Sequence, residues 1–445
     1  MSETMFWKAI GAVGAVALIV MIATATTSRA AVGGPGLTAV PCPDLSWQND
    51  DPTFEALPGT RASFGRYDGG LYRVEIPDAW NGELVLWAHG FVDHRSPQGT
   101  QLRVGFPGAG QAGQGRPFRE HLIASGFAWA ASSYRCNGYV PGIGLLDTMG
   151  LGEIFTKTNG GSAPTRTYLT GGSMGGHVTV LGLQEFPTNF AGGLAMCPAG
   201  PGEMDFLAAV GAASELISGV TVSDATRDQD VARLTDVVGV PPRYTDKGRQ
   251  LASVQIEISG GPRPFAMEGL SARFTQNVSA GASILTEAAW SQVATNTSLR
   301  YAIDESLGLT AESINSRIRR KVANLEARSP NGRYEETIPF DGRIERPLLT
   351  LHGTGDLFVP VSLQRTLKQA VDTAGASELL VQRLMRIPGH CGFSRTEQAR
   401  AFDALVKWVH EGARPEGDDV MGNLSDAGLK FTDPLRAGDP GTAKP

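Results

Sequence analysis

Short apolar runs alternate with helical stretches along much of the chain, and this alternation constrains the fold more than any other feature. Four runs have the length and composition of buried strands: Glu83–Ala88, Phe127–Ser133, Arg166–Thr170 and Ala191–Met196. Three stretches beside them are predicted to be helices: Phe118–Ser125, Leu145–Lys157 and Met174–Glu185. This order predicts an α/β fold with a mostly parallel central sheet and helices on both of its faces.

The pattern begins with a hairpin and is interrupted once. Arg61–Tyr67 and Leu71–Ile76 flank an Asp-Gly-Gly turn, so six strands precede Cys197, where the alternation stops. We expect residues 198–345 to form a large helical cap inserted after the sixth strand. Its predicted helices are Met204–Ser218, Asp228–Val237, Ser283–Val293 and Ala311–Ala327.

The alternation resumes after the cap. It continues through strand Pro347–Leu351, helix Leu363–Thr373, strand Leu379–Ile387 and helix Thr396–His410. The core is therefore predicted to comprise residues 36–197 and 346–410. Residues 411–445 have a loop-like composition and are expected to form a C-terminal surface tail.

The N-terminus has the order of a secretory signal peptide. Residues 1–30 contain one lysine, a continuous apolar run and a small-residue end at Ala30. We expect export to an extracellular or periplasmic compartment, with no stable membrane insertion after cleavage. The alternative is an uncleaved membrane anchor, because the stretch from Ala9 to Ser28 could span a bilayer. The net charge of −6 gives a nucleic-acid partner no basic surface to bind.

The sequence Gly171-Gly172-Ser173-Met174-Gly175 joins a predicted strand to a predicted helix. A GxSxG pattern alone is weak, because glycine occupies 56 of the 445 positions. The context makes it specific, since a serine on a strand-to-helix turn needs small residues two positions away on each side. Gly171 and Gly175 meet that need, and the N–H groups of the new helix can stabilise negative charge beside the hydroxyl.

A serine nucleophile needs a base and an acid that orients the base, and both have candidates downstream. Asp356 follows the strand PLLTL, and His390 follows the strand LVQRLMRI. One helix and one strand separate them, which places both loops at the same edge of the sheet. Upstream, the strand ELVLWA ends in His89-Gly90-Phe91. The N–H groups of Phe91 and Met174 are therefore expected to form an oxyanion hole.

Other residues compete for these roles. Asp205, after the strand that ends at Met196, is the alternative acid, whereas Asp304 and Asp341 are expected to be solvated. His89 and His352 are expected to hold loops, and His177 to be packed in its helix. The remaining histidines, His94, His121 and His410, are expected at the surface or at helix ends.

Four motifs, each after a predicted strand and in this order, resemble the α/β-hydrolase superfamily: HGF at His89, GGSMGG at Ser173, HGTGD at Asp356 and PGHCGF at His390. The resemblance implies a Ser173–His390–Asp356 triad, an acyl-enzyme intermediate, and neither metal nor cofactor. PDAWNGELVLWAHG and PGHCGF are similar to secreted serine esterases and to the catalytic domain of prolyl-oligopeptidase-type enzymes. Tannase and feruloyl-esterase relatives carry a cysteine immediately before the serine, where this chain has Gly172.

The chain has four cysteines, an even number that suits an oxidising compartment, and none of them is in a CxxC motif. Four cysteines allow three pairings. Cys197 and Cys391 are both expected at the edge of the sheet that carries the site, which favours a Cys197–Cys391 bridge and a Cys42–Cys136 bridge. The other two pairings stay open.

The sequence therefore predicts an exported serine hydrolase that cleaves a small-molecule carboxylic ester. The apolar cap segments FLAAVGAASELISGV and ASILTEAAW favour a covered hydrophobic pocket. Three alternatives remain: a peptidase or amidase of the prolyl-oligopeptidase type, a lipase, and a non-catalytic binding module on the same scaffold. The GxGxxG match at Gly108–Gly113 is interpreted as a rim loop, because no acidic residue closes a later strand at the distance a dinucleotide site requires.

Overall fold

A computed structural model describes residues 46–47, 54–93, 101–108, 117–286, 294–323, 340–436 and 439. All of them belong to one compact unit, Gly34–Pro445. The expected signal peptide, residues 1–30, lies outside the described residues. Within the described part of the chain, every helix is too short or too polar to cross a membrane.

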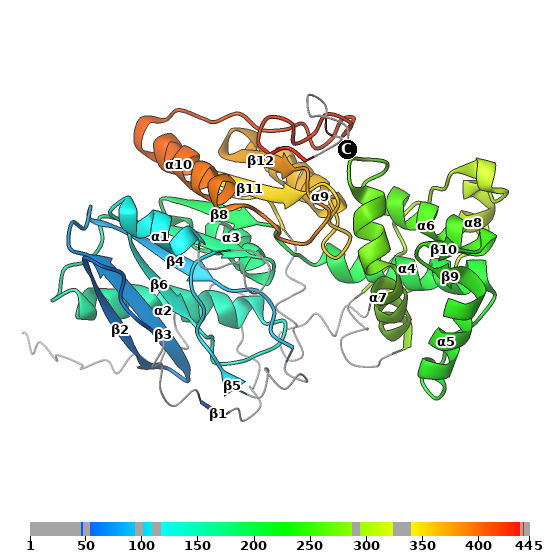
Figure 1. Ribbon diagram of the computed structural model, residues 1–445, viewed down its shortest axis with the longest axis horizontal. Helices are drawn as coiled ribbons and strands as arrows, with labels where there is room; N and C mark the ends of the chain where they lie inside the picture. The colour runs from blue at the N-terminus through cyan, green and yellow to red at the C-terminus, as the bar shows by residue number, and fades with distance from the viewer. Residues whose placement is uncertain are drawn as a thin grey trace, which may run out of the picture. The chain divides into compact units, whose positions relative to one another are not determined.

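The central sheet has eight strands in the order β12-β11-β8-β7-β4-β6-β3-β2. The six from β6 to β12 in this order run parallel, and β2 and β3 are antiparallel at one edge (Figure 1). The prediction of a mostly parallel sheet is thus confirmed. The strands are β2 (Thr60–Tyr67), β3 (Gly70–Pro77), β4 (Glu83–Ala88), β6 (Ala128–Ser132), β7 (Arg166–Gly172), β8 (Gly192–Met196), β11 (Leu348–Gly353) and β12 (Leu380–Met385).

Helices pack on both faces of the sheet, as predicted. One face is covered by α2 (Pro141–Thr158), α3 (Met174–Glu185) and α9 (Ser362–Thr373), the other by α1 (Pro117–Ala124) and α10 (Arg395–Glu411). In β4, Leu84 and Leu86 pack on the face covered by α2, α3 and α9, whereas Val85 and Trp87 pack on the face covered by α1 and α10. A strand that is buried on both sides is apolar at nearly every position, which explains the continuous run LVLWA after Glu83. Two short strands, β1 (Ser46–Trp47) and β5 (Gln101–Leu102), pair outside this sheet.

The stretch between β8 and β11, which we call the insertion, is mainly helical and has its own apolar cluster. β8 is the sixth strand of the sheet in chain order, and the insertion follows it. Its elements are α4 (Gly202–Ser218), α5 (Arg227–Val238), β9 (Gly239–Val240), β10 (Arg243–Tyr244), α6 (Asp246–Ile258), α7 (Ala266–Thr286), η5 (Glu305–Leu307) and α8 (Ala311–Arg317).

The structure differs from the prediction at two helices of the insertion. Helix α6 was not predicted, and a helix was expected to begin at Ser283, whereas α7 begins at Ala266. A Cβ atom on Gly211 of α4 would overlap the backbone of Gly281 in α7, and the reverse substitution would overlap as well. These two glycines therefore allow α4 and α7 to cross closely.

Helix α8 is shorter than predicted. It ends at Arg317, and Ile318 is already extended, with ψ of 136°. Asn296 takes the backbone groups that a longer helix would use: its amide nitrogen donates to the Arg319 carbonyl at 3.0 Å and its amide oxygen accepts from Lys321 N–H at 2.7 Å. A tertiary contact thus ends this helix.

The segment after α10 lies against the sheet rather than free on the surface. The N–H of Asp418 donates to the Gln382 carbonyl at 2.7 Å, and the carboxylate of Asp418 accepts from the N–H of Leu384 at 2.7 Å. Val420 and Leu424 are buried beside Leu384. Since β12 is an edge strand, its outer N–H and C=O groups need partners, and this segment supplies them.

Candidate active site

Ser173 lies on a sharp turn between β7 and α3. Its φ of 59° and ψ of −122° are sterically unfavourable for a residue with a side chain. A Cβ atom on Gly171 or Gly175 would run into neighbouring backbone, so the turn tolerates only glycine at both positions. The peptide groups of Ser173 are tied to the end of β8, since its N–H donates to the Met196 carbonyl at 2.9 Å and its carbonyl accepts from Ala199 N–H at 3.1 Å.

The structure brings the three residues proposed for the triad together. The Nε2 atom of His390 lies 2.8 Å from the Oγ of Ser173. Its Nδ1 atom lies 2.6 Å from an oxygen of Asp356. An ionised carboxylate can only accept hydrogen bonds, so Nδ1 carries the proton and Nε2 is left to accept one from the serine.

Asp356 is held as an anion despite being 1 % exposed. Burial opposes its ionisation, but the charge of His390 and the hydrogen bond from it lower the pKa of Asp356 below its ordinary value. Its second oxygen accepts from the N–H groups of Phe358 and Val359, each at 3.0 Å. Hydrogen bonds within its own loop therefore hold the Asp356 carboxylate in place, in addition to the bond with His390.

The turn His89-Gly90-Phe91 lies beside the serine. A Cβ atom on Gly90 would be 3.9 Å from the Oγ of Ser173. Nδ1 of His89 lies 2.7 Å from the Gly90 carbonyl, and its ring stacks on Tyr134 at 3.8 Å. Because C=O and N–H point in opposite directions in a trans peptide, this contact turns the Phe91 N–H away from the His89 ring. The N–H of Met174 belongs to the first turn of α3, which has no helical acceptor.

A disulfide joins Cys197 to Cys391, with 5.4 Å between their Cα atoms. It links the end of β8 to the residue that follows His390, so the expected first pair is confirmed. The expected second pair includes Cys42, which lies outside the described residues.

The alternative residues lie elsewhere. Asp205 accepts from the N–H of Thr295 at 2.7 Å within the insertion. Asp304 caps η5 through Ser306, and Asp341 pairs with Arg343. Of the glycine-rich match at 108–113, only Gly108 is described.

The remaining described histidines have structural partners. His352 Nε2 lies 2.9 Å from the Val359 carbonyl, and burial lowers the pKa of His352 to about 4. His177 bonds the Tyr139 hydroxyl at 2.9 Å. His121 pairs with Asp403 and His410 with Glu83, while His94 lies outside the described residues.

Three residues near the site had no signal in the sequence. The Phe358 ring meets the His390 ring edge to face, with centroids 5.1 Å apart. Burial and the charge of Asp356 raise the pKa of Glu203 to about 8. Arg263 of the insertion donates to the carbonyl of Thr354, two residues before Asp356. Phe358 belongs to the same loop as Asp356, whereas Glu203 and Arg263 reach the site from the insertion through tertiary packing.

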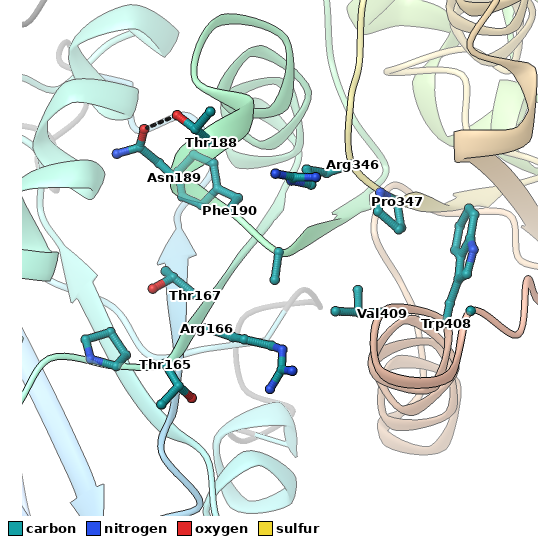
Figure 2. Close-up of a pocket in the computed structure, with 13 residues that line it drawn as sticks. Thr165, Arg166, Thr167, Thr188, Asn189, Phe190, Arg346, Pro347, Trp408 and Val409 are labelled. Atoms are coloured by element: carbon teal, nitrogen blue, oxygen red, sulfur yellow. Dashed lines mark hydrogen bonds between the residues drawn. The ribbon is translucent and has the colours of Figure 1, made fainter.

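A pocket of about 610 Å³ lies at the opposite edge of the sheet, where β7, β8 and β11 begin. Figure 2 shows Arg166 and Arg346 among its lining side chains, with Trp408 and Val409 of α10 on one side. Ser173 follows the other end of β7, so this pocket is separate from the candidate site.

The sequence matches no protein-family model and no curated protein. Among solved structures, feruloyl esterase B from Aspergillus oryzae is similar with a TM-score of 0.43 and 13% identity, over 79% of this chain and 80% of that one. An esterase from Pyrococcus furiosus gives a TM-score of 0.36 and 15% identity, over 79% and 90%. The acylaminoacyl peptidase of Pyrococcus horikoshii gives 0.39 and 11%, over 82% and 44%.

The strand order and the serine turn identify the fold on their own. Six parallel strands, an antiparallel hairpin at one edge and helices on both faces carry a serine on a strained strand-to-helix turn, followed in the chain by an acid and then a histidine. This arrangement of strands, helices and turn is that of the α/β-hydrolase fold.

Proposed function

We propose that the protein is a serine hydrolase that cleaves carboxylic esters. The observation that carries the proposal is the continuous hydrogen-bonded row from Ser173 through His390 to Asp356, with separations of 2.8 and 2.6 Å. A hydroxyl so placed can lose its proton to the imidazole as it attacks a carbonyl.

The reaction has two halves. Ser173 Oγ attacks the ester carbonyl while Nε2 of His390 takes the hydroxyl proton. That proton then passes to the alcohol oxygen as the bond between the carbonyl carbon and the alcohol breaks. Water repeats the sequence on the acyl-enzyme, releasing the carboxylic acid and free Ser173. Asp356 keeps the imidazole in the required tautomer throughout and stabilises its positive charge.

Negative charge develops on the carbonyl oxygen in each half. We propose that the N–H groups of Met174 and Phe91 receive it, because one opens α3 and the other follows Gly90 beside Ser173. Each donor of this kind is worth about 3 kcal/mol in other enzymes. The role needs only backbone groups, so the Phe91 side chain, 43 % exposed, is free to vary.

The proposed substrate class rests on the insertion, and the proposed compartment rests on the N-terminal segment. The insertion brings apolar helices to the edge of the sheet that carries Ser173, which favours an ester with an apolar acyl or alcohol group. The N-terminal segment favours export before the enzyme acts.

The test is a panel of esters of graded chain length and aromaticity, run beside a matched arylamide. The purified protein is compared with Ser173→Ala and with Ser271→Ala, an exposed serine on α7. We expect ester turnover that disappears in the first variant and persists in the second. A preference for the arylamide would indicate a peptidase. Activation of ester hydrolysis at an oil–water interface would indicate a lipase. Equal activity of the protein and Ser173→Ala on every substrate would reject the proposal.

A further inference from the structure

The connection between α6 and α7, residues 259–265, runs against the loop that carries Asp356. We call that loop, residues 354–361, the acid loop. The N–H of Ser362, just beyond it, donates to the Ser259 carbonyl at 3.0 Å. A Cβ atom on Gly355 would meet the carbonyl of Phe265 and the backbone of Pro388. The insertion is therefore in direct backbone contact with the acid loop.

Arg263 is the polar centre of this contact. Its Nε donates to the Thr354 carbonyl at 2.6 Å. Its other donors reach the Gly261 carbonyl at 2.7 Å and the Ser259 hydroxyl at 3.2 Å. All three acceptors are neutral, so these bonds hold the guanidinium in place without neutralising its charge.

Asp356 is the acid with which that charge interacts most strongly. Burial lowers the pKa of Arg263 to about 10, but the attraction of Asp356 acts in the opposite direction and the group stays cationic at neutral pH. Glu257 and Arg365 are the other charged groups that act on Arg263, and they have opposite signs.

The other groups around Asp356 carry little fixed charge at neutral pH. The buried His352, with a pKa of about 4, is neutral. Glu203, with a pKa of about 8, is mostly protonated. His390 takes up and releases its proton during the proposed reaction. Arg263, which donates to the carbonyl two residues before Asp356, is thus a lasting cation that interacts with this acid.

A second contact links the insertion to the histidine side of the site. A Cβ atom on Gly269, in the first turn of α7, would overlap the carbonyls of Gly355 and Pro388. These two carbonyls come from the acid loop and from the loop that carries His390. The start of α7 therefore packs against both loops, with Arg263 three residues before it.

We propose that Arg263 is a positioning residue for the hydrolase reaction: from the insertion, it fixes the acid loop and holds a permanent positive charge beside Asp356. This inference rests on the proposed function of Ser173, His390 and Asp356. Arg263 acts through Asp356 and needs no contact with the substrate.

Two effects are expected in Arg263→Met, which removes the charge and the hydrogen bonds but keeps much of the side-chain length. The loosened acid loop lowers kcat/KM by about 10- to 100-fold, the order of loss that a misplacement of about 1 Å causes. Without the nearby cation, the Asp356–His390 pair takes up a proton more readily, so the acidic limb of the kcat/KM profile moves to higher pH. A purely structural role would not move that limb.

Two further variants make the test specific. Arg263→Lys keeps the charge but loses the forked hydrogen bonds, so it should lose rate while its acidic limb stays in place. Arg320→Met is the matched control, because Arg320 also lies in the insertion and donates to the carbonyls of Asn296 and Leu299 at 2.8 and 2.7 Å. It should keep the rate and the pH profile of the unaltered protein.

The experiment measures kcat/KM against pH for the four proteins on one ester, with a melting temperature for each. The inference is overturned if Arg263→Met has an unchanged profile, or loses rate without a shift of the acidic limb, or if Arg320→Met behaves in the same way. An unaltered protein that cleaves no ester would instead refute the proposed function, so the two failures are distinguishable.

Discussion

The Nε2 atom of His390 lies 2.8 Å from the Oγ of Ser173, although 217 positions separate the two residues in the chain. The proximity follows from the sheet. Strands β7, β11 and β12 are parallel, and Ser173, Asp356 and His390 each come shortly after one of them. Parallel strands end at a common edge, so loops far apart in sequence meet there.

The choice of acid gives the first prediction. Asp356→Asn should lower kcat by about 10⁴-fold, because an amide in this position favours the wrong imidazole tautomer. Asp205→Asn is the matched control, since Asp205 bonds Thr295 within the insertion and should leave kcat nearly unchanged. Steady-state kinetics on one ester decide the point. A large loss of kcat in Asp205→Asn and none in Asp356→Asn would instead assign the role of the acid to Asp205.

Glu203 gives a prediction on pH and stability. Its pKa is about 8 in the folded protein against 4.5 for an ordinary glutamate, so the folded state binds its proton more tightly than the unfolded state. The stability associated with this proton is complete below about pH 4.5 and is lost as the pH rises toward 8.

Glu203→Gln mimics the protonated side chain and removes this loss. Its unfolding free energy should therefore match the unaltered protein near pH 4.5 and exceed it increasingly up to pH 8, by at most about 1.4 kcal/mol per pH unit. Denaturant unfolding at several pH values measures the difference. Glu312→Gln, at an exposed position on α8, is the control and should follow the unaltered protein. Parallel curves for Glu203→Gln and the unaltered protein would contradict the prediction.

The disulfide gives a third prediction. Cys197 and Cys391 are 194 positions apart, and the bond fixes the residue after His390 to the end of β8. The double variant Cys197→Ala/Cys391→Ala should lose about 2–5 kcal/mol of unfolding free energy. It should also react more slowly with an ester, because the His390 loop is less constrained. A melting temperature and a rate equal to those of the unaltered protein would show that the bond is dispensable.

The segment after α10 gives a fourth prediction. Asp418→Ala removes the acceptor of the Leu384 N–H at the outer side of β12 and should cost about 1–3 kcal/mol. Asp419→Ala changes the exposed neighbour, which bonds only nearby backbone, and should cost less. Thermal unfolding compares the two. If the Asp419 variant were the less stable one, the assignment of Asp418 as a support of the edge strand would be wrong.

The extent to which sequence predicts this fold depends on how local each signal is. The run ELVLWA and the turn around Ser173 are encoded by adjacent residues, and the helix Met174–Glu185 has the predicted limits. The predicted start of helix α7 was wrong. Its glycines allow close contact with α4, and the local sequence carries no sign of that contact. Helix α8 was overextended because Asn296, many residues upstream, ends it.

The same distinction applies to the site. Asp356 and His390 each follow a strand, so chain order and fold logic suffice to propose them. Arg263 and Glu203 reach Asp356 only through the packing of the insertion, whose tertiary arrangement has no sequence motif. The structure was therefore needed to find the residues that interact with Asp356, whereas chain order was enough to find those proposed to react.

Covalent labelling tests the central claim most directly. A fluorophosphonate probe forms a phosphonate ester with an activated serine as fluoride leaves, and peptide mass spectrometry then locates the added mass. We expect one modified residue, Ser173, and a labelling rate that falls steeply in His390→Ala. Absence of labelling at Ser173 in folded protein, or equal labelling in His390→Ala, would contradict it.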